Sequence, residues 1–333
     1  SNNVDCCARV CHASTAQALR QATGTGAASA CYDDIEQARL IVLVGANPTE
    51  AHPVIGARLL QAVRRGARLV VIDPRRTELA SIADVFVQLR PGTNVPLLNA
   101  LAKLLIESGR IDRGYLAART EGFAELAAHV SRGDVADAAR ICAVPEPVIR
   151  AAAREIGDAG TALFVSGLGT SELTQGTGSV LALANLALLT GSVGRLGAGL
   201  LPLRGQNNVQ GNADMGGMPD LFTGYQPLDD PAVRERLERL WGALPPTTLG
   251  KTVPEMLTAA REGALRGLWI QGEDIAQSDP NQHHVEAALS RLEFLVIQEI
   301  FPSETQAFAH LVLPAAGVFE QDGTFTNAER RIQ

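Results

Sequence analysis

Short apolar runs alternate in the first half of the chain with longer stretches whose apolar positions recur at helical spacing. Runs at 38–45, 67–73 and 84–89 are typical of strands buried in a parallel sheet. Helical patterns follow at 54–63 and 95–106. This repeated strand, helix, strand order predicts an α/β fold, with dinucleotide-binding-like (Rossmann-like) parallel sheets that carry helices on both faces.

The second half of the chain continues the alternation after one interruption. Residues 112–160 look helical throughout, punctuated by Pro145 and Pro147, and a strand at 161–167 and a helix at 178–189 follow. The Gly- and Asn-rich stretch 197–217 predicts a long loop and the best internal boundary. Beyond it the pattern predicts helices at 230–242, 252–263 and 281–292, and strands at 267–271 and 294–298.

Composition narrows the class of protein. The chain is 46% hydrophobic and 20% charged, which predicts a soluble globular protein with a sizeable core. Its net charge of -7 comes from dispersed acids and bases, and no basic stripe is interleaved with aromatic residues, so a nucleic-acid partner is not expected. No apolar run approaches the roughly 20 residues of a membrane-spanning helix, so we expect no membrane contact from this segment.

Cysteines gather near the start of the chain. Five cysteines with no recognisable secretory leader indicate a reducing compartment, and we expect a cytoplasmic protein. The spacing of Cys6, Cys7 and Cys11 has no second downstream pair, so it fits neither a zinc ribbon nor a four-cysteine iron–sulfur site. Cys6 and Cys7 are interpreted as small buried apolar side chains. Cys11 differs, because His12 and a helix-start signal follow it, and a helix N-terminus stabilises a thiolate.

Polar residues follow each of the first three predicted strands. The carboxyl ends of parallel strands form the ligand crevice of α/β folds, and an acid after the second strand commonly meets a ribose or a base. The first turn, GANPTE, lacks the G-x-G-x-x-G pattern, which argues against NAD. Turn chemistry explains each residue alone, but the set predicts a nucleotide-containing ligand. Its members are Asn47, Thr49, Glu50, Asp73, Arg75, Arg90, Gly92 and Asn94.

Eight blocks of sequence carry a resemblance to a known family. They are VDCCARVCH (4–12), GANPTEAHP (45–53), VIDPRRTE (71–78), LRPGTN (89–94), NLALLTGSVGRLGAG (185–199), LRGQNNVQGNADMGG (203–217), QGEDIAQSDPN (271–281) and FEQDGTFTNAERR (319–331). In this order, over essentially the whole chain, they resemble the catalytic (alpha) subunit of a molybdopterin oxidoreductase, specifically a formate dehydrogenase. The Cys-His pair and the RGQNNVQG block carry the narrower resemblance.

The resemblance also implies a domain organisation. Residues 1–206 would form one dinucleotide-binding-like domain with the Cys-His motif, and 207–318 part of a second that binds a pterin guanine dinucleotide. Residues 319–333 would begin a segment returning to an N-terminal domain with a [4Fe-4S] cluster. That domain and a C-terminal β-rich domain are absent from this chain, so we expect the 333 residues alone to be inactive and without cofactor.

The implied cofactor is molybdenum or tungsten bis-molybdopterin guanine dinucleotide. Cys11 would bind the metal. One nucleotide would be held by Asn47, Glu50, Asp73, Arg75, Gly92 and Asn94. Where the family often has a Gln, this chain has Glu172, whose charge would face a phosphate. The second nucleotide would be held by Leu168, Gly169, Glu172, Gln206, Gly272, Glu273, Asp274, Ser278 and Gln298.

The implied reaction is formate oxidation to carbon dioxide, within bacterial anaerobic respiration. Arg204 beside Gly205 can hold a carboxylate bidentately, and His12 can hold or pass on the departing proton. Iron–sulfur or flavin/NAD-linked electron-transfer subunits are the expected partners. Two alternatives remain: a nitrate reductase of the same superfamily, which usually lacks this histidine, and a non-catalytic structural relative in a respiratory complex.

Overall fold

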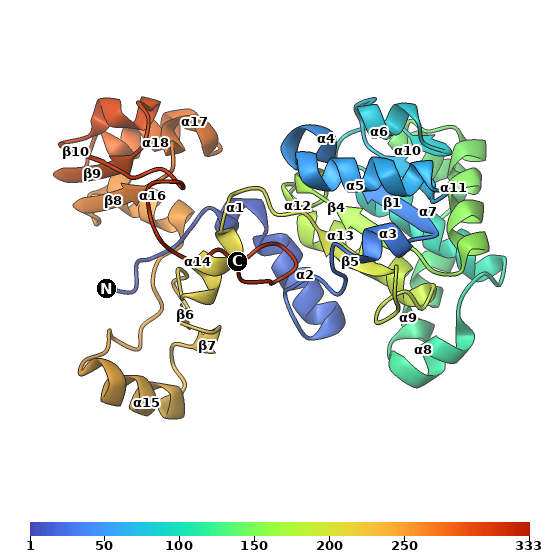
Figure 1. Cartoon of the computed structure of the whole chain (residues 1–333), viewed down its shortest axis with the longest axis horizontal. Helices are drawn as coiled ribbons and strands as arrows, with labels where there is room; N and C mark the ends of the chain where they lie inside the picture. The colour runs from blue at the N-terminus through green and yellow to red at the C-terminus, as the bar shows by residue number, and fades with distance from the viewer. The chain divides into compact units, whose positions relative to one another are not determined.

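The computed structural model describes residues 1–333, which divide into two compact units (Figure 1). The large unit comprises Cys11–Gly205 and Ala328–Arg331. The small unit comprises Ser1–Val10, Gln206–Asn327 and Ile332–Gln333. The predicted first domain, 1–206, included the first ten residues, whereas in the structure they belong to the same unit as Gln206–Asn327. No helix is long and apolar enough to cross a membrane.

The large unit is built around a five-stranded parallel sheet in the order β3-β2-β1-β4-β5. Strand order reverses between β1 and β4, which is the topological switch point where α/β sheets open a ligand crevice. Its elements are α2 (Ala13–Thr23), α3 (Asp34–Gln37), β1 (Leu40–Val44), α4 (Pro48–Ala51), α5 (Pro53–Arg64), β2 (Arg68–Ile72), α6 (Glu78–Ser81), β3 (Val85–Val87), α7 (Asn94–Glu107), α8 (Arg113–Arg119), α9 (Phe123–Ser131), α10 (Val135–Cys142), α11 (Glu146–Ala159), β4 (Leu163–Ser166), α12 (Leu168–Ser171), α13 (Gly176–Leu189) and β5 (Gly199–Pro202).

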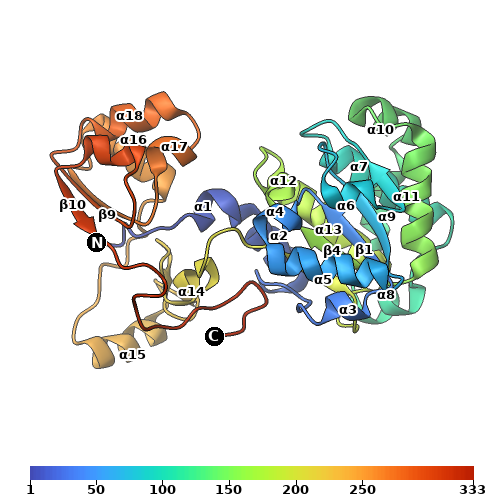
Figure 2. The ribbon, with the colours of Figure 1, turned by 45° about the horizontal axis from the view of Figure 1, so that its top comes forward.

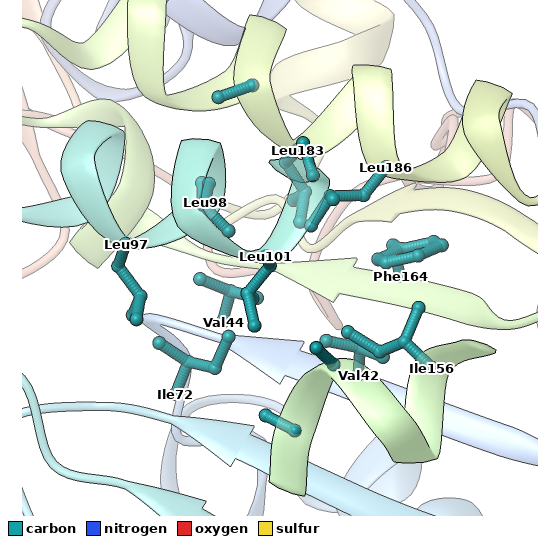
Figure 3. Close-up of a cluster of buried hydrophobic side chains, with 14 of the residues drawn as sticks. Val42, Val44, Ile72, Leu97, Leu98, Leu101, Ile156, Phe164, Leu183 and Leu186 are labelled. Carbon is teal, nitrogen blue, oxygen red and sulfur yellow. The ribbon is translucent and has the colours of Figure 1, made fainter. Parts of the chain in front are cut away.

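Both faces of this sheet are buried, because successive strand side chains point to opposite sides. Val42, Val44 and Phe164 pack on one face with side chains of α7, α11 and α13, as Figure 3 shows. Ile41 and Leu43 point the other way and pack with α3, α5 and α6. Burial on both sides is why these strands appear in the sequence as continuous apolar runs.

The small unit contains a three-stranded parallel sheet in the order β10-β9-β8. Apolar residues of α16 and α18 cover one of its faces, on the same side of β9 and β10 in Figure 2. Its elements, with helix α1 at the change of unit, are α1 (Ala8–Cys11), α14 (Val209–Asp214), β6 (Leu221–Phe222), β7 (Gln226–Pro227), α15 (Pro231–Trp241), α16 (Val253–Glu262), β8 (Gly267–Gln271), α17 (Ile275–Ser278), α18 (Gln282–Leu289), β9 (Phe294–Glu299), the 3₁₀ helix η1 (Glu304–Phe308) and β10 (Leu311–Pro314).

The α/β class with parallel sheets is confirmed, one local prediction is wrong and one is incomplete. The stretch 197–217 is not one loop, because it contains the fully buried strand β5 and the short helix α14. The stretch 112–160 has the predicted break at Pro145, between α10 and α11, but further breaks divide it into the four helices α8 to α11. Ala143 ends α10 in a left-handed conformation with φ 56°, whereas Gly122, with φ 77°, is the N-cap residue of α9.

Candidate active site

The strand-end residues predicted from the first three runs lie at one edge of the large sheet, since β1, β2 and β3 are parallel neighbours. Asn47 and Glu50 follow β1, where Asn47 precedes the first turn of α4 and its Oδ1 accepts a hydrogen bond from Thr49 Oγ1 at 3.0 Å. Asp73 follows β2 and accepts from the backbone N–H of Arg75 at 2.8 Å. Burial raises the pKa of Asp73.

Gly92 and Asn94, which follow β3, are held against the loop that follows β4. Asn94 Nδ2 donates to the carbonyl of Gly169 at 3.0 Å, and Gln175 Nε2 donates to the carbonyl of Gly92. These bonds bring members of the two predicted nucleotide sets together at the carboxyl end of the sheet. Leu168 is the first residue of α12, which follows β4, and Glu172 is its C-cap residue, where burial raises the pKa of Glu172.

Two glycines let the ends of β1 and β4 touch at the switch point. Gly45 has φ +55°, and a Cβ built there would lie 2.6 Å from the carbonyl carbon of Gly169. A Cβ on Gly169 would lie 2.8 Å from Cα of Gly45. The Gly169 N–H also donates to the Gly45 carbonyl at 3.0 Å. Only glycine at both positions permits this backbone contact.

The Cys-His pair lies at the junction between α1 and α2. Cys11 is the last residue of α1, and His12 occupies the N-cap position of α2, so the expected place near a helix N-terminus is confirmed. Cys11 is buried, and its carbonyl accepts a hydrogen bond from Ser171 Oγ at 2.8 Å. In return, Ser14 Oγ donates to the carbonyl of Ser171 at 2.6 Å. This reciprocal pair fixes the Cys11 backbone against the β4 loop.

Cys11, His12 and Arg204 are brought together within the large unit. A Cβ on Gly205, the residue after Arg204, would lie 3.9 Å from Cys11 Sγ. His12 is 1% exposed, and burial followed by the positive charge of Arg204 lowers the pKa of His12 to about 3. His12 Nδ1 lies 3.4 Å from Thr15 Oγ1, whereas its buried Nε2 makes no hydrogen bond. The imidazole is therefore neutral near pH 7, with one polar atom available to a bound group.

The backbone of Arg204 is held by a residue that the sequence did not single out. His52 Nε2 lies 2.5 Å from the carbonyl oxygen of Arg204. The Arg204 guanidinium is half-buried, and its Nη2 lies 3.5 Å from the carbonyl of Gly26.

The remaining members of the second predicted nucleotide set belong to the small unit. Gly272, which follows β8, donates its N–H to the carbonyl of Gln298 in β9 at 2.9 Å. Asp274 precedes α17, at whose end Ser278 lies, and accepts from Thr305 Oγ1 at 2.6 Å. Gln206 is exposed and is the first residue of the segment Gln206–Asn327 of the small unit. Because Leu168, Gly169 and Glu172 belong to the large unit, the complete set stays a prediction.

Glu273 has an acidic environment in the small unit. Burial raises the pKa of Glu273 to about 7, and Asp279 and Asp5 act in the same direction. Asp279 Oδ2 is buried without a hydrogen-bond partner. Asp5 is paired with Arg9 at 2.9 Å. The Glu273 carboxyl can therefore be protonated near neutral pH and donate a hydrogen bond.

Of the two cysteines interpreted as small buried apolar side chains, Cys6 is buried and Cys7 is only partly buried. Cys6 is buried in a cluster with Ala8 and Val209, and Cys7 packs against it. A hydrogen bond from Cys7 lowers the pKa of Cys6 to about 7. No group of three or more His, Cys, Asp or Glu side chains is arranged to hold a metal ion.

Comparison with known proteins gives the family. The F420-dependent formate dehydrogenase subunit alpha of Methanocaldococcus jannaschii is 42% identical over 333 residues, which are 100% of this chain and 49% of that protein. Formate dehydrogenase H of Escherichia coli is 40% identical over 335 residues, covering 100% of this chain and 47% of that protein. The chain therefore spans about half the length of these curated relatives.

A solved structure agrees on the fold. Acetylene hydratase from Pelobacter acetylenicus superposes with a TM-score of 0.69 over 95% of this chain and 47% of its own, at 20% sequence identity. The sequence model of the molybdopterin oxidoreductases matches residues 1–333. With that match from end to end, the chain belongs to the molybdopterin oxidoreductase family.

Proposed function

We propose that this chain is the central cofactor- and substrate-binding part of a formate dehydrogenase, which oxidises formate to carbon dioxide. The observation that carries the proposal is the meeting of Cys11, His12 and Arg204 in one unit from segments almost two hundred residues apart. The two relatives above, whose names are those of formate dehydrogenases, support the same reaction. A structural subunit would have no use for a thiol, a buried imidazole and a guanidinium held together.

Membership of the family implies a molybdopterin cofactor with molybdenum or tungsten. The residues fit such a group, because the buried Nε2 of His12 lacks a partner and the Cys11 thiol lies beside the flexible Gly205. Cys11 would be the protein ligand to the metal, since a thiolate is a suitable soft ligand. When bound, the cofactor would accept the two electrons that formate loses.

The chain's own residues would bind formate and move its proton. Formate oxidation breaks one C–H bond and releases carbon dioxide, one proton and two electrons. The Arg204 guanidinium would hold the carboxylate through paired N–H donors, which lysine cannot reproduce. Pairing with that carboxylate offsets the charge of Arg204, and this raises the pKa of His12 from its lowered value. His12 Nε2 would then be the atom that takes up the proton.

The finer form of the cofactor, a pair of pterin guanine dinucleotides, is also part of this proposal. In the large unit, Asn47, Asp73 and Arg75 offer oxygen acceptors and a cation at the carboxyl ends of β1 and β2, which suits a guanine and a phosphate. In the small unit, Gly272 and Glu273 follow β8 in the corresponding position. A [4Fe-4S] cluster in the rest of the full-length protein, and separate electron-transfer subunits, complete the proposed enzyme.

Metal and pterin analysis of the full-length gene product tests the proposal directly. We expect stoichiometric molybdenum or tungsten with pterin, reduction of an oxidised dye by formate, and no oxidation of a reduced dye by nitrate assayed in parallel. The variant Cys11→Ala should abolish formate oxidation because it removes the metal ligand. Nitrate reduction without formate oxidation would reject the proposed substrate.

Arg204 provides the quantitative test of substrate binding. Loss of a bidentate, charge-assisted contact in Arg204→Ala should lower kcat/KM for formate by a factor of about 30 to 1,000, which corresponds to about 2–4 kcal/mol. Arg204→Lys keeps the positive charge but loses the paired N–H donors of the guanidinium. Its kcat/KM for formate should therefore lie between the values for wild type and Arg204→Ala. An Arg204→Ala enzyme within about threefold of wild type would remove Arg204 from the mechanism.

A further inference from the structure

His52 is fixed by its own backbone before it contacts anything else. It lies between α4 and α5, where its N–H donates to the carbonyl of Pro48 at 3.0 Å and its carbonyl accepts from Gly56 N–H at 2.8 Å. Pro53 begins α5 directly after it and restricts the backbone further. The half-buried imidazole therefore projects from a rigid junction between two helices.

The segment that His52 contacts has just left the sheet. Leu203 N–H makes the last bond from this segment to β4, donating to the carbonyl of Ser166 at 2.8 Å. The next carbonyl, that of Arg204, lies 2.5 Å from His52 Nε2, although the residues are 152 apart in the sequence. A carbonyl only accepts hydrogen bonds, so Nε2 must carry the hydrogen. His52 is thus a donor to the peptide group that links Arg204 to Gly205.

We propose that His52 is a positioning residue that holds the Arg204–Gly205 peptide and so directs the Arg204 guanidinium toward the substrate carboxylate. This inference rests on the proposed function for its kinetic consequence, but the contact itself does not depend on that function. The need for an anchor follows from the sequence, since exposed Gly205 and Gln206 come next and glycine leaves the backbone free to rotate. His52 reaches the substrate only through Arg204.

Kinetics of the full-length holoenzyme give the first test. His52→Ala should raise KM for formate about 3- to 10-fold, the range for one lost hydrogen bond, and change kcat less than about threefold. His52→Gln should restore KM to within about twofold, because its side-chain amide also donates N–H. In an Arg204→Ala background, His52→Ala should change kcat/KM little, because both substitutions remove the same contact. His283→Ala, at a side chain 98% exposed, is the matched control.

Trypsin gives a second test that needs neither cofactor nor activity. The carbonyl that His52 holds belongs to the peptide bond that trypsin would cleave after Arg204. Mass spectrometry measures the rate of this cleavage relative to cleavage after the exposed Arg239. The relative rate should be at least about threefold higher in His52→Ala than in wild type. In His52→Gln it should equal the wild-type rate.

The outcomes separate the two proposals. If the wild-type enzyme does not oxidise formate but trypsin behaves as expected, the proposed function fails and the contact stands. Unchanged cleavage at Arg204 in His52→Ala would overturn the positioning role. Additive losses of kcat/KM in the variant that combines Arg204→Ala with His52→Ala would overturn the positioning role as well. So would a KM for formate in His52→Gln that is as high as in His52→Ala. Should His52→Ala fail to fold, His52→Asn, whose amide is too short to reach, takes its place.

Discussion

The protonation of Glu273 couples the stability of the small unit to pH. Burial raises the pKa of Glu273 from 4.5 to about 7, with Asp279 and Asp5 adding to the effect. The folded state thus disfavours the charged form, and stability falls as pH rises from about 4.5 to about 7. Glu273→Gln should therefore raise the free energy of unfolding by about 1–2 kcal/mol at pH 8, allowing for solvent screening, and change it little at pH 4.5.

Urea unfolding at the two pH values measures this difference. Glu238→Gln, at an exposed position of α15, is the matched control, and its free energy of unfolding should differ little from that of the wild type at either pH. A gain from Glu273→Gln that is equal at pH 4.5 and pH 8 would mean that packing, rather than charge, is responsible.

At the residue scale, the sequence singles out candidate site residues where their chemistry is concentrated in consecutive letters, and their roles stay predictions. The Cys11-His12 pair and the Arg204 block stand out because each groups unusual side chains within a short motif. The residues that hold them were missed, because each contact joins residues far apart in the sequence. Ser171 is 160 residues from Cys11, and His52 is 152 residues from Arg204. Serine or histidine in a loop is common, so only the fold shows which one becomes an anchor.

At the scale of elements, the close approach of β1 and β4 depends on Gly169. A Cβ there would lie 2.8 Å from Cα of Gly45, and neither backbone can move without disturbing the sheet. Gly169→Ala should therefore lower the free energy of unfolding by about 1–3 kcal/mol, the usual cost of overpacking. Thermal unfolding followed by far-UV circular dichroism measures the change.

Gly178 provides the matched control for this substitution. It lies in the first turn of α13, where an added Cβ would meet only Val95 Cγ2, at an ordinary distance of 3.7 Å. Gly178→Ala should be neutral or stabilising by up to about 1 kcal/mol, because alanine favours helix. Equal destabilisation by both substitutions would show that the Gly45 contact is not the cause.

The elements that sequence reasoning found and missed differ in how they are stabilised. Strands β1, β2 and β4 are apolar runs buried on both sides, so their sequence alone identifies them. Strand β5 (Gly199–Pro202) begins with glycine and ends with proline, which are turn signals, yet its place at the sheet edge tolerates proline. Helix α14 includes Gly211 and Asn212, poor helix formers that tertiary contacts override.

At the scale of the whole molecule, the two units differ in how completely their sheets are covered. The large sheet has apolar clusters on both faces. The small sheet leaves Trp269 62%, Phe294 53% and Leu311 43% exposed on the face opposite α16 and α18, where strand register aligns them. Each unit buries its own core, and we expect the small unit to open at a lower free energy.

Hydrogen exchange with mass spectrometry on the 333-residue chain tests this expectation strand by strand. Amides of β9 should exchange at least about tenfold faster than amides of β1, since 1.4 kcal/mol corresponds to a factor of ten. Two matched substitutions show whether the units open independently. Val285→Ala in α18 and Val180→Ala in α13 each remove two methyl groups from a fully buried site, at a cost of about 2 kcal/mol.

If the units open independently, Val285→Ala speeds exchange in β9 about 10- to 30-fold and leaves β1 unchanged, whereas Val180→Ala does the reverse. This follows because Val285 contributes only to the core under β8 and β9, and Val180 only to the core of the large sheet. Acceleration of both strands by either substitution would instead make the 333 residues one cooperative folding unit. In that case the open face of the small sheet would not lower the stability of its unit separately.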